Sequence, residues 1–76
     1  MKQSLDQDAL QTLLSTRTLR DFRACRHGAG WALEGRLGTV WLPVRSKRLQ
    51  RRVWLSLTAL GRFCESMGIQ TLVVEL

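Results

Sequence analysis

The sequence predicts a small α+β domain with a three- to four-stranded antiparallel sheet, an N-terminal helix, a second helix and a C-terminal strand. Three observations lead to this fold class. Alternating apolar and polar residues occupy the middle of the chain, stretches with helical spacing lie on either side, and glycines separate the alternating stretches. With 76 residues, of which 45% are hydrophobic, the chain has room for a single packed domain, which we place at 1–76.

The first helix is predicted over residues 5–15, where the apolar residues recur at spacings of one, three and four. Ser4 can cap this helix. Asp6 and Asp8 then fall in the first turn, where the helix dipole favours negative charge.

A strand is predicted to follow and to run to about Arg26, with Phe22 and Ala24 on one face. A longer helix through Cys25 also fits this stretch. The sequence His-Gly-Ala-Gly at 27–30 predicts a turn, because glycine adopts positive φ angles without strain where a hairpin reverses.

The next two strands are predicted to form a hairpin. Residues 31–37 alternate between apolar and polar, which is typical of a half-buried strand. Gly38 turns the chain into the segment 39–44, and Pro43 favours an edge position for that strand because proline lacks a backbone donor.

The remaining elements are a short extended run, a helix and a strand. The extended run covers residues 52–55, and Ser56 can cap a helix from Leu57 to Met67. Gly68 is expected to end that helix, and residues 71–76 are predicted to form the final strand.

The strongest functional signal is the basic segment, residues 45–52, with five cationic side chains in eight residues and no acid between Glu34 and Glu65. The whole chain has a formal charge of +6. Such a concentration of like charge favours a polyanionic partner, since phosphates release counterions when cations neutralise them. The alternative is a solvated hairpin tip that keeps a small protein soluble. The predicted phosphate contacts are Arg45, Lys47, Arg48, Arg51 and Arg52.

Two further sets of residues are auxiliary candidates. Trp41 could stack on bases if it is exposed, as tryptophans do in single-strand binders. A row of arginines recurs at every third position, and on a strand it would alternate between the two faces. The row comprises Arg17, Arg20, Arg23 and Arg26.

The residue types needed for catalysis are scarce, with one His, no Tyr and six scattered carboxylates, so we expect no enzyme and no cofactor. Cys25 and Cys64 belong to no CxxC or Cys/His pair, so we expect no metal site and two reduced thiols, which suits the cytoplasm. No apolar run approaches the roughly 20 residues that cross a bilayer, so no membrane partner is expected.

Three stretches carry a resemblance to a known family: Gly-Trp-Ala-Leu at 30–33, Val-Arg-Ser-Lys at 44–47, and the tail from Ser56 through Gly68 to Leu76. In these the chain resembles the small partition-associated ParC-type proteins of bacterial plasmids and integrated elements. The resemblance implies an accessory role in the maintenance of a mobile element. It also implies DNA, or partition and replication proteins, as partners, and it offers no catalytic residues.

A second likeness is architectural. A three-stranded sheet followed by a helix is similar to the arm-site DNA-binding domains of integrases, whose sheet enters the major groove. This likeness makes Arg36, together with Arg45 and Arg52, a plausible DNA contact. The terminal strand departs from that pattern.

We therefore expect a non-enzymatic accessory protein that binds nucleic acid, with DNA favoured, through the basic segment. The alternative is a protein-interaction module, an adaptor or inhibitor that docks on an acidic protein or forms a homodimer by pairing at a sheet edge.

Overall fold

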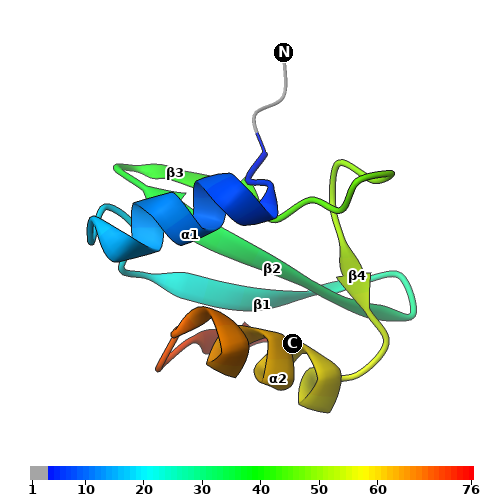
Figure 1. Ribbon diagram of the computed structural model, residues 1–76. Helices are drawn as coiled ribbons and strands as arrows, with labels where there is room; N and C mark the ends of the chain where they lie inside the picture. Colours follow the sequence, from blue (N-terminus) through cyan, green and yellow to red (C-terminus); the bar gives the residue numbers. More distant parts are fainter. Residues whose placement is uncertain (1–3) are drawn as a thin grey trace.

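The computed structural model describes residues 4–76 and shows two helices on one side of a mixed β-sheet (Figure 1). The α+β class is therefore confirmed, with an N-terminal helix and a C-terminal strand as expected. In chain order the elements are α1 (Gln7–Ser15), β1 (Phe22–His27), β2 (Gly30–Leu37), β3 (Val40–Pro43), β4 (Val53–Trp54), α2 (Leu57–Met67) and β5 (Val73–Glu75).

The strands are arranged in the order β3-β2-β1-β5, and β4 pairs with β2 beyond the end of β3. Both predicted hairpins are present, because β1 and β3 each pair antiparallel with β2. Gly28 and Gly38 have positive φ angles of 59° and 65° in the two turns. The segment that fitted either a strand or a longer helix forms strand β1.

The sheet is not antiparallel throughout, because β5 pairs parallel with β1. The reason lies in the connection through α2. Strand β4 runs antiparallel to β2 and hence parallel to β1. Helix α2 carries the chain back to the end at which β4 began, so the next strand runs in the direction of β4 again.

The core lies between the helices and one face of the sheet, which we call the helix-covered face. Leu10 of α1 and Leu60 of α2 are almost fully buried and belong to the same cluster as Leu33 of β2. At the β4 end, Trp54 lies opposite Trp31, and its ring centroid is 5.1 Å from that of Phe63. Both of these tryptophans are therefore core residues.

The start of α2 agrees with the sequence prediction, whereas the start of α1 does not. Ser56 caps α2 as expected, and Gly68 ends it with a φ angle of 85°. The cap of α1 is Asp6 rather than Ser4, because the Asp6 carboxylate accepts a 2.7 Å hydrogen bond from the N–H of Ala9. Leu5 instead forms an isolated parallel bridge with Val44, which shortens the helix.

Neither helix of residues 4–76 lies on the other side of the sheet, which we call the open face (Figure 1). Strand alternation and register place on it Arg23, Cys25, Ala32, Glu34, Arg36, Trp41, Val53, Val73 and Glu75. Within residues 4–76, no helix is long and apolar enough to cross a membrane.

Candidate nucleic-acid interface

The basic segment forms a loop whose two ends meet. The N–H of Arg52 donates a 2.8 Å hydrogen bond to the carbonyl of Val44, so residues 45–51 leave the sheet and return to the same point. Within the loop, the Ser46 hydroxyl accepts from the N–H of Leu49 at 3.0 Å, and Ser46 N–H donates to the Leu49 carbonyl. The chain reversal is thus held by its own polar groups, and the loop projects from the sheet beside the start of α1 (Figure 1).

The five predicted contact residues differ in exposure. Lys47 and Arg48 are exposed at the tip, whereas Arg45, Arg51 and Arg52 near the base are half-buried. Among residues 4–76, only Arg51 of these five lies within ion-pair distance of a carboxylate. The other four cations of the basic segment therefore have no ion-pair partner among residues 4–76.

Arg51 is held by the sheet. Its Nη1 lies 2.7 Å from Oε2 of Glu34 on the open face, and Glu34 is only 7% exposed. The other carboxylate oxygen of Glu34 accepts a 2.6 Å hydrogen bond from Nε of Arg23. Glu34 thus bridges two guanidinium groups, one from β1 and one from the basic segment.

The charge state of Glu34 follows from these contacts. Burial alone would raise the pKa of the Glu34 carboxyl, but the hydrogen bonds and charges of Arg51 and Arg23 outweigh burial and bring the pKa below its ordinary value. Glu34 is therefore ionised in neutral solution and remains a strong acceptor for both guanidinium groups.

The open face is electrostatically balanced. Its guanidinium groups belong to Arg23, Arg36 and Arg51, and each is paired with a carboxylate of Asp21, Glu34 or Glu75. Every ion pair found among residues 4–76 lies on or beside this face. The uncompensated charge of the protein therefore lies elsewhere, and the basic segment carries its densest part.

Arg36, the contact suggested by the integrase likeness, and Trp41, the candidate for base stacking, are paired side by side on the open face. Arg36 is paired with the carboxylate of Asp21. Trp41 is half-buried, and the guanidinium carbon of Arg23 lies 4.2 Å from the centroid of its ring. This stacking occupies part of the indole surface that base stacking would need.

Arg52 packs against aromatic rings at the base of the loop. Its guanidinium carbon lies 4.5 Å from the ring centroid of Trp54 and 5.0 Å from that of Phe63. Arg45 uses its Nε to donate to the carbonyl of Ser46 at 3.2 Å. The side chains of Arg52 and Arg45 are therefore held by aromatic rings and a carbonyl group, and these neutral partners leave their positive charges uncancelled.

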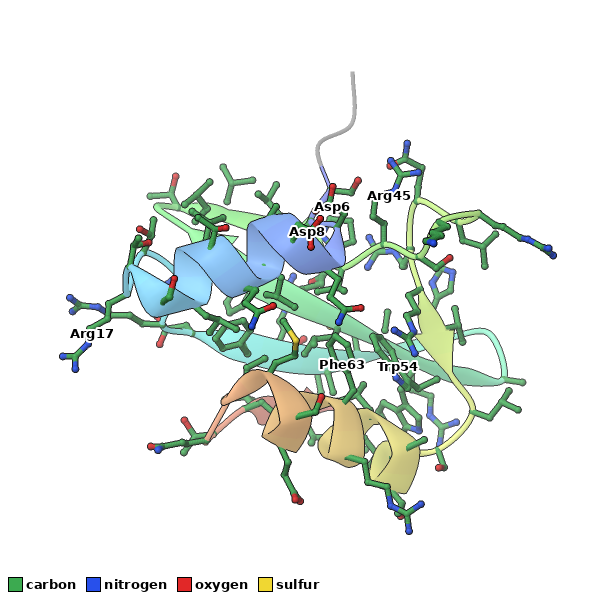
Figure 2. All side chains as sticks on the ribbon, in the orientation of Figure 1. Asp6, Asp8, Arg17, Arg45, Trp54 and Phe63 are labelled. Carbon is green, nitrogen blue, oxygen red and sulfur yellow. The ribbon has the colours of Figure 1, made fainter. Side chains whose placement is uncertain are left out.

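A cleft of about 640 Å³ separates the basic segment from the start of α1. Figure 2 shows Asp6 and Asp8 at the first turn of α1, beside Arg45 of the loop. Lys47 and Arg52 also line the cleft on the loop side. One wall is thus acidic and the other basic, and of the two exposed cations at the loop tip, Lys47 lines the cleft whereas Arg48 does not.

The arginine row is divided by the fold. Arg23 lies on the open face, whereas Arg26 pairs with Trp31 and stacks over its ring at 4.9 Å on the opposite side of β1. Arg17 has a φ angle of 59° in the turn after α1, and Arg20 donates a hydrogen bond to its carbonyl. The row therefore does not form one basic surface.

The role of Glu34 and the acidic wall of the cleft were not predicted from the sequence. A signal for Glu34 was present, since it is the lone acid within strand β2 and falls on a polar position of the alternation. Its partners could not be read from the sequence, because Arg23 and Arg51 lie 11 and 17 residues away along the chain.

The thiols are poorly suited to nucleophilic chemistry. Burial raises the pKa of Cys64, and burial together with the negative charge of Glu34 raises the pKa of Cys25. Both cysteines are free. A raised pKa leaves little thiolate at neutral pH, so neither thiol is activated.

Comparisons of the chain with protein-family models, with curated proteins and with solved structures find no match.

Proposed function

We propose that the protein binds nucleic acid, with DNA favoured, through the basic segment, as a non-enzymatic accessory protein of a plasmid or similar mobile element. A role in partition or maintenance follows from the resemblance to ParC-type proteins, and with it a cytoplasmic location in which the free thiols stay reduced. The single observation that supports binding is the closed loop that holds four cations without a carboxylate partner among residues 4–76.

The proposed contacts are Lys47 and Arg48 at the tip, assisted by Arg45 and Arg52 at the base. Four cations meeting phosphates would release counterions, and the slope of log affinity against log salt would approach about −3 to −4 on duplex DNA. These contacts touch the phosphate backbone and carry no direct sequence information. Arg51 serves to anchor the loop, because Glu34 already occupies its guanidinium group.

Contact through the loop is better supported than contact through the open face. The three guanidinium groups of that face are balanced by three carboxylates, two of which, Asp21 and Glu75, are themselves half-exposed. Phosphates approaching the face would meet these negative charges. The docking mode of the integrase arm-site domains, with the sheet in the groove, is therefore the weaker proposal here.

The test is fluorescence anisotropy with labelled duplex and single-stranded DNA, from about 50 to about 200 mM salt. The K47A/R48A double variant should lose affinity and flatten the salt slope by about 2. The matched control is the R20A/R62A double variant, because both arginines are exposed, lie outside the loop and make no ion pair among residues 4–76. Equal losses in the two double variants would mean that binding is not localised in the loop, and absence of binding at low salt would refute the proposal.

One observation favours a protein partner as a second candidate. Leu49 is 56% exposed at the loop tip, between the cations, where an apolar side chain serves no phosphate contact. An acidic protein with an apolar pocket would use both features. Pull-down from a nuclease-treated lysate separates the two functions, since a protein partner survives the nuclease and L49A would release it, whereas a nucleic-acid bridge disappears.

A further inference from the structure

The two edges of the sheet are protected to different degrees. At the β3 edge, Leu5 pairs with the backbone at the end of β3. Its N–H donates to the carbonyl of Pro43 and its carbonyl accepts from the N–H of Arg45, both at 2.8 Å. Pro43 itself has no backbone donor to offer. At the other edge, β5 pairs with β1 alone, and no backbone hydrogen bond from its outer side reaches any of residues 4–76.

The side chains of the β5 edge are mostly apolar and exposed. Val73 is 63% exposed, Val74 41% and Leu76 97%. The charged residue of the strand, Glu75, is drawn toward Arg23 of the neighbouring strand, with 3.5 Å between Oε1 and Nη1. Proteins protect an edge strand by keeping it short or with lysine, proline, a bulge or a covering segment; β5 is short, with three residues, but within residues 4–76 it has none of the other devices.

We infer that β5 pairs antiparallel with the β5 strand of a second copy of this chain, about a two-fold axis at Val74. In a two-fold interface, each contact occurs twice: if one residue of the first copy contacts another residue of the second copy, the same two positions also meet with the copies exchanged. In this register Val74 faces its own equivalent, and Leu72 faces Leu76 of the second copy. Because these residues share the helix-covered side of the strand, the pairing would build a continuous apolar row.

The distribution of charge also favours a second copy. The two chains each carry a net charge of +6, which would oppose association if the charge lay at the interface. The basic segment lies instead next to β4, which is separated from β5 by β2 and β1, or about 14 Å at the usual strand spacing. At the β5 edge, Glu75 and Arg23 offset each other. The two basic segments would therefore lie at opposite ends of one continuous sheet.

Sedimentation equilibrium of the nuclease-treated protein, from micromolar to about millimolar concentration, tests the inference without nucleic acid. The wild-type chain should dimerise reversibly. V74K places two like charges face to face and should raise the dissociation constant about tenfold or more, and V74E should do the same. An equimolar mixture of the two variants should restore association, since the ammonium group of one variant would then face the carboxylate of the other. The matched control is V40K, because Val40 is 55% exposed on β3 and should tolerate lysine.

Amide hydrogen exchange of the wild-type chain gives a measurement that needs no variant to fold. Exchange at residues 72–76 should slow as the protein concentration rises, whereas exchange at residues 40–42 of β3 should not change. A monomer over the whole concentration range would overturn the inference. So would a mixture of V74K and V74E that stays dissociated while both variants keep the wild-type circular dichroism, or a V40K variant that dissociates as strongly as V74K.

Discussion

Arg51 donates a 2.7 Å hydrogen bond from Nη1 to Oε2 of Glu34, and this bond fastens the basic segment to the open face of the sheet. Glu34 is buried on the face opposite α1 and α2, because Arg23 and Arg51 pair with its two oxygens. A buried carboxylate between two guanidinium groups is stable only while both partners stay in place. The position of the loop and the order of the open face therefore depend on the same residue.

Replacing Glu34 by glutamine should destabilise the fold by about 1–3 kcal/mol, because two charge-assisted hydrogen bonds lose their anionic acceptor. Urea unfolding followed by tryptophan fluorescence measures this change. E65Q is the control, since Glu65 is exposed on α2 and makes no ion pair among the residues described. Equal free energies of unfolding for E34Q and E65Q would show that the ion pairs of Glu34 with Arg23 and Arg51 add no net stability.

The same carboxylate predicts a pH dependence of stability. The pKa of Glu34 in the folded chain lies below its ordinary value of 4.5, so the unfolded chain takes up a proton first as the solution is acidified. The contribution of Glu34 is therefore complete above pH 4.5 and is lost as the pH falls through the lower pKa of the folded state. The difference in unfolding free energy between wild type and E34Q should be largest near neutrality and should shrink in acid. A difference that stays constant from neutral pH into strong acid would contradict this.

Arg51 and Arg48 should respond differently to the same substitution. R51Q removes a partner of Glu34 and should cost about 1–2 kcal/mol of stability, with little change in the salt slope of DNA binding. R48Q should leave stability within about 0.5 kcal/mol and reduce the slope by about 1. Urea unfolding and anisotropy titrations on both variants check the contrast. If R51Q reduced the slope of log affinity against log salt more than R48Q does, Arg51 would leave Glu34 on binding and contact a phosphate instead.

Removing the acidic wall of the cleft should strengthen DNA binding. D8N takes away a carboxylate that faces the basic segment, and we expect affinity to rise about two- to threefold at low salt and less at high salt, because the interaction is screened. E65Q again serves as the control, since it removes the same charge from a surface outside the cleft. Anisotropy titrations of both variants at two salt concentrations provide the measurement, and an equal gain in both would reduce the effect to net charge.

Gly30 should not tolerate alanine. A Cβ at this position would lie 2.5 Å from the carbonyl oxygen of Trp54 and 2.6 Å from a methyl carbon of Val53, so β4 would have to move away from β2. We expect a cost of about 1–3 kcal/mol. Gly61 is the matched control in α2, where a Cβ would meet no atom within 4 Å and alanine should stabilise the helix by up to about 1 kcal/mol. Thermal unfolding of G30A and G61A should therefore shift in opposite directions.

The parts of the fold that could be predicted are those that depend on neighbours in the chain. Gly28 and Gly38 indicated the two hairpins, and Ser56 and Gly68 bounded α2, because turns and caps depend on a few consecutive residues. The class of the fold followed from these elements. The predicted cap of α1 was wrong by two positions. Leu5 forms a β-bridge with Val44 and therefore does not continue the helix.

The parts that could not be predicted depend on contacts between distant residues. Neither the parallel pairing of β5 with β1 nor the bridge from Arg51 to Glu34 has a local signature in the sequence. For the same reason the five cations looked alike in the sequence, although their surroundings separate Arg51 from the others. The assignment of these residues to nucleic-acid contact stays a prediction.

The hydrogen bond that joins Arg52 to Val44 has an evolutionary consequence. Because the intervening residues leave the sheet and rejoin it at one place, insertions in the exposed stretch 47–50, which leaves out the anchoring Arg51, should leave the pairing of β2 with β3 and β4 intact. The length and composition of this stretch can therefore vary while the β-sheet keeps its architecture.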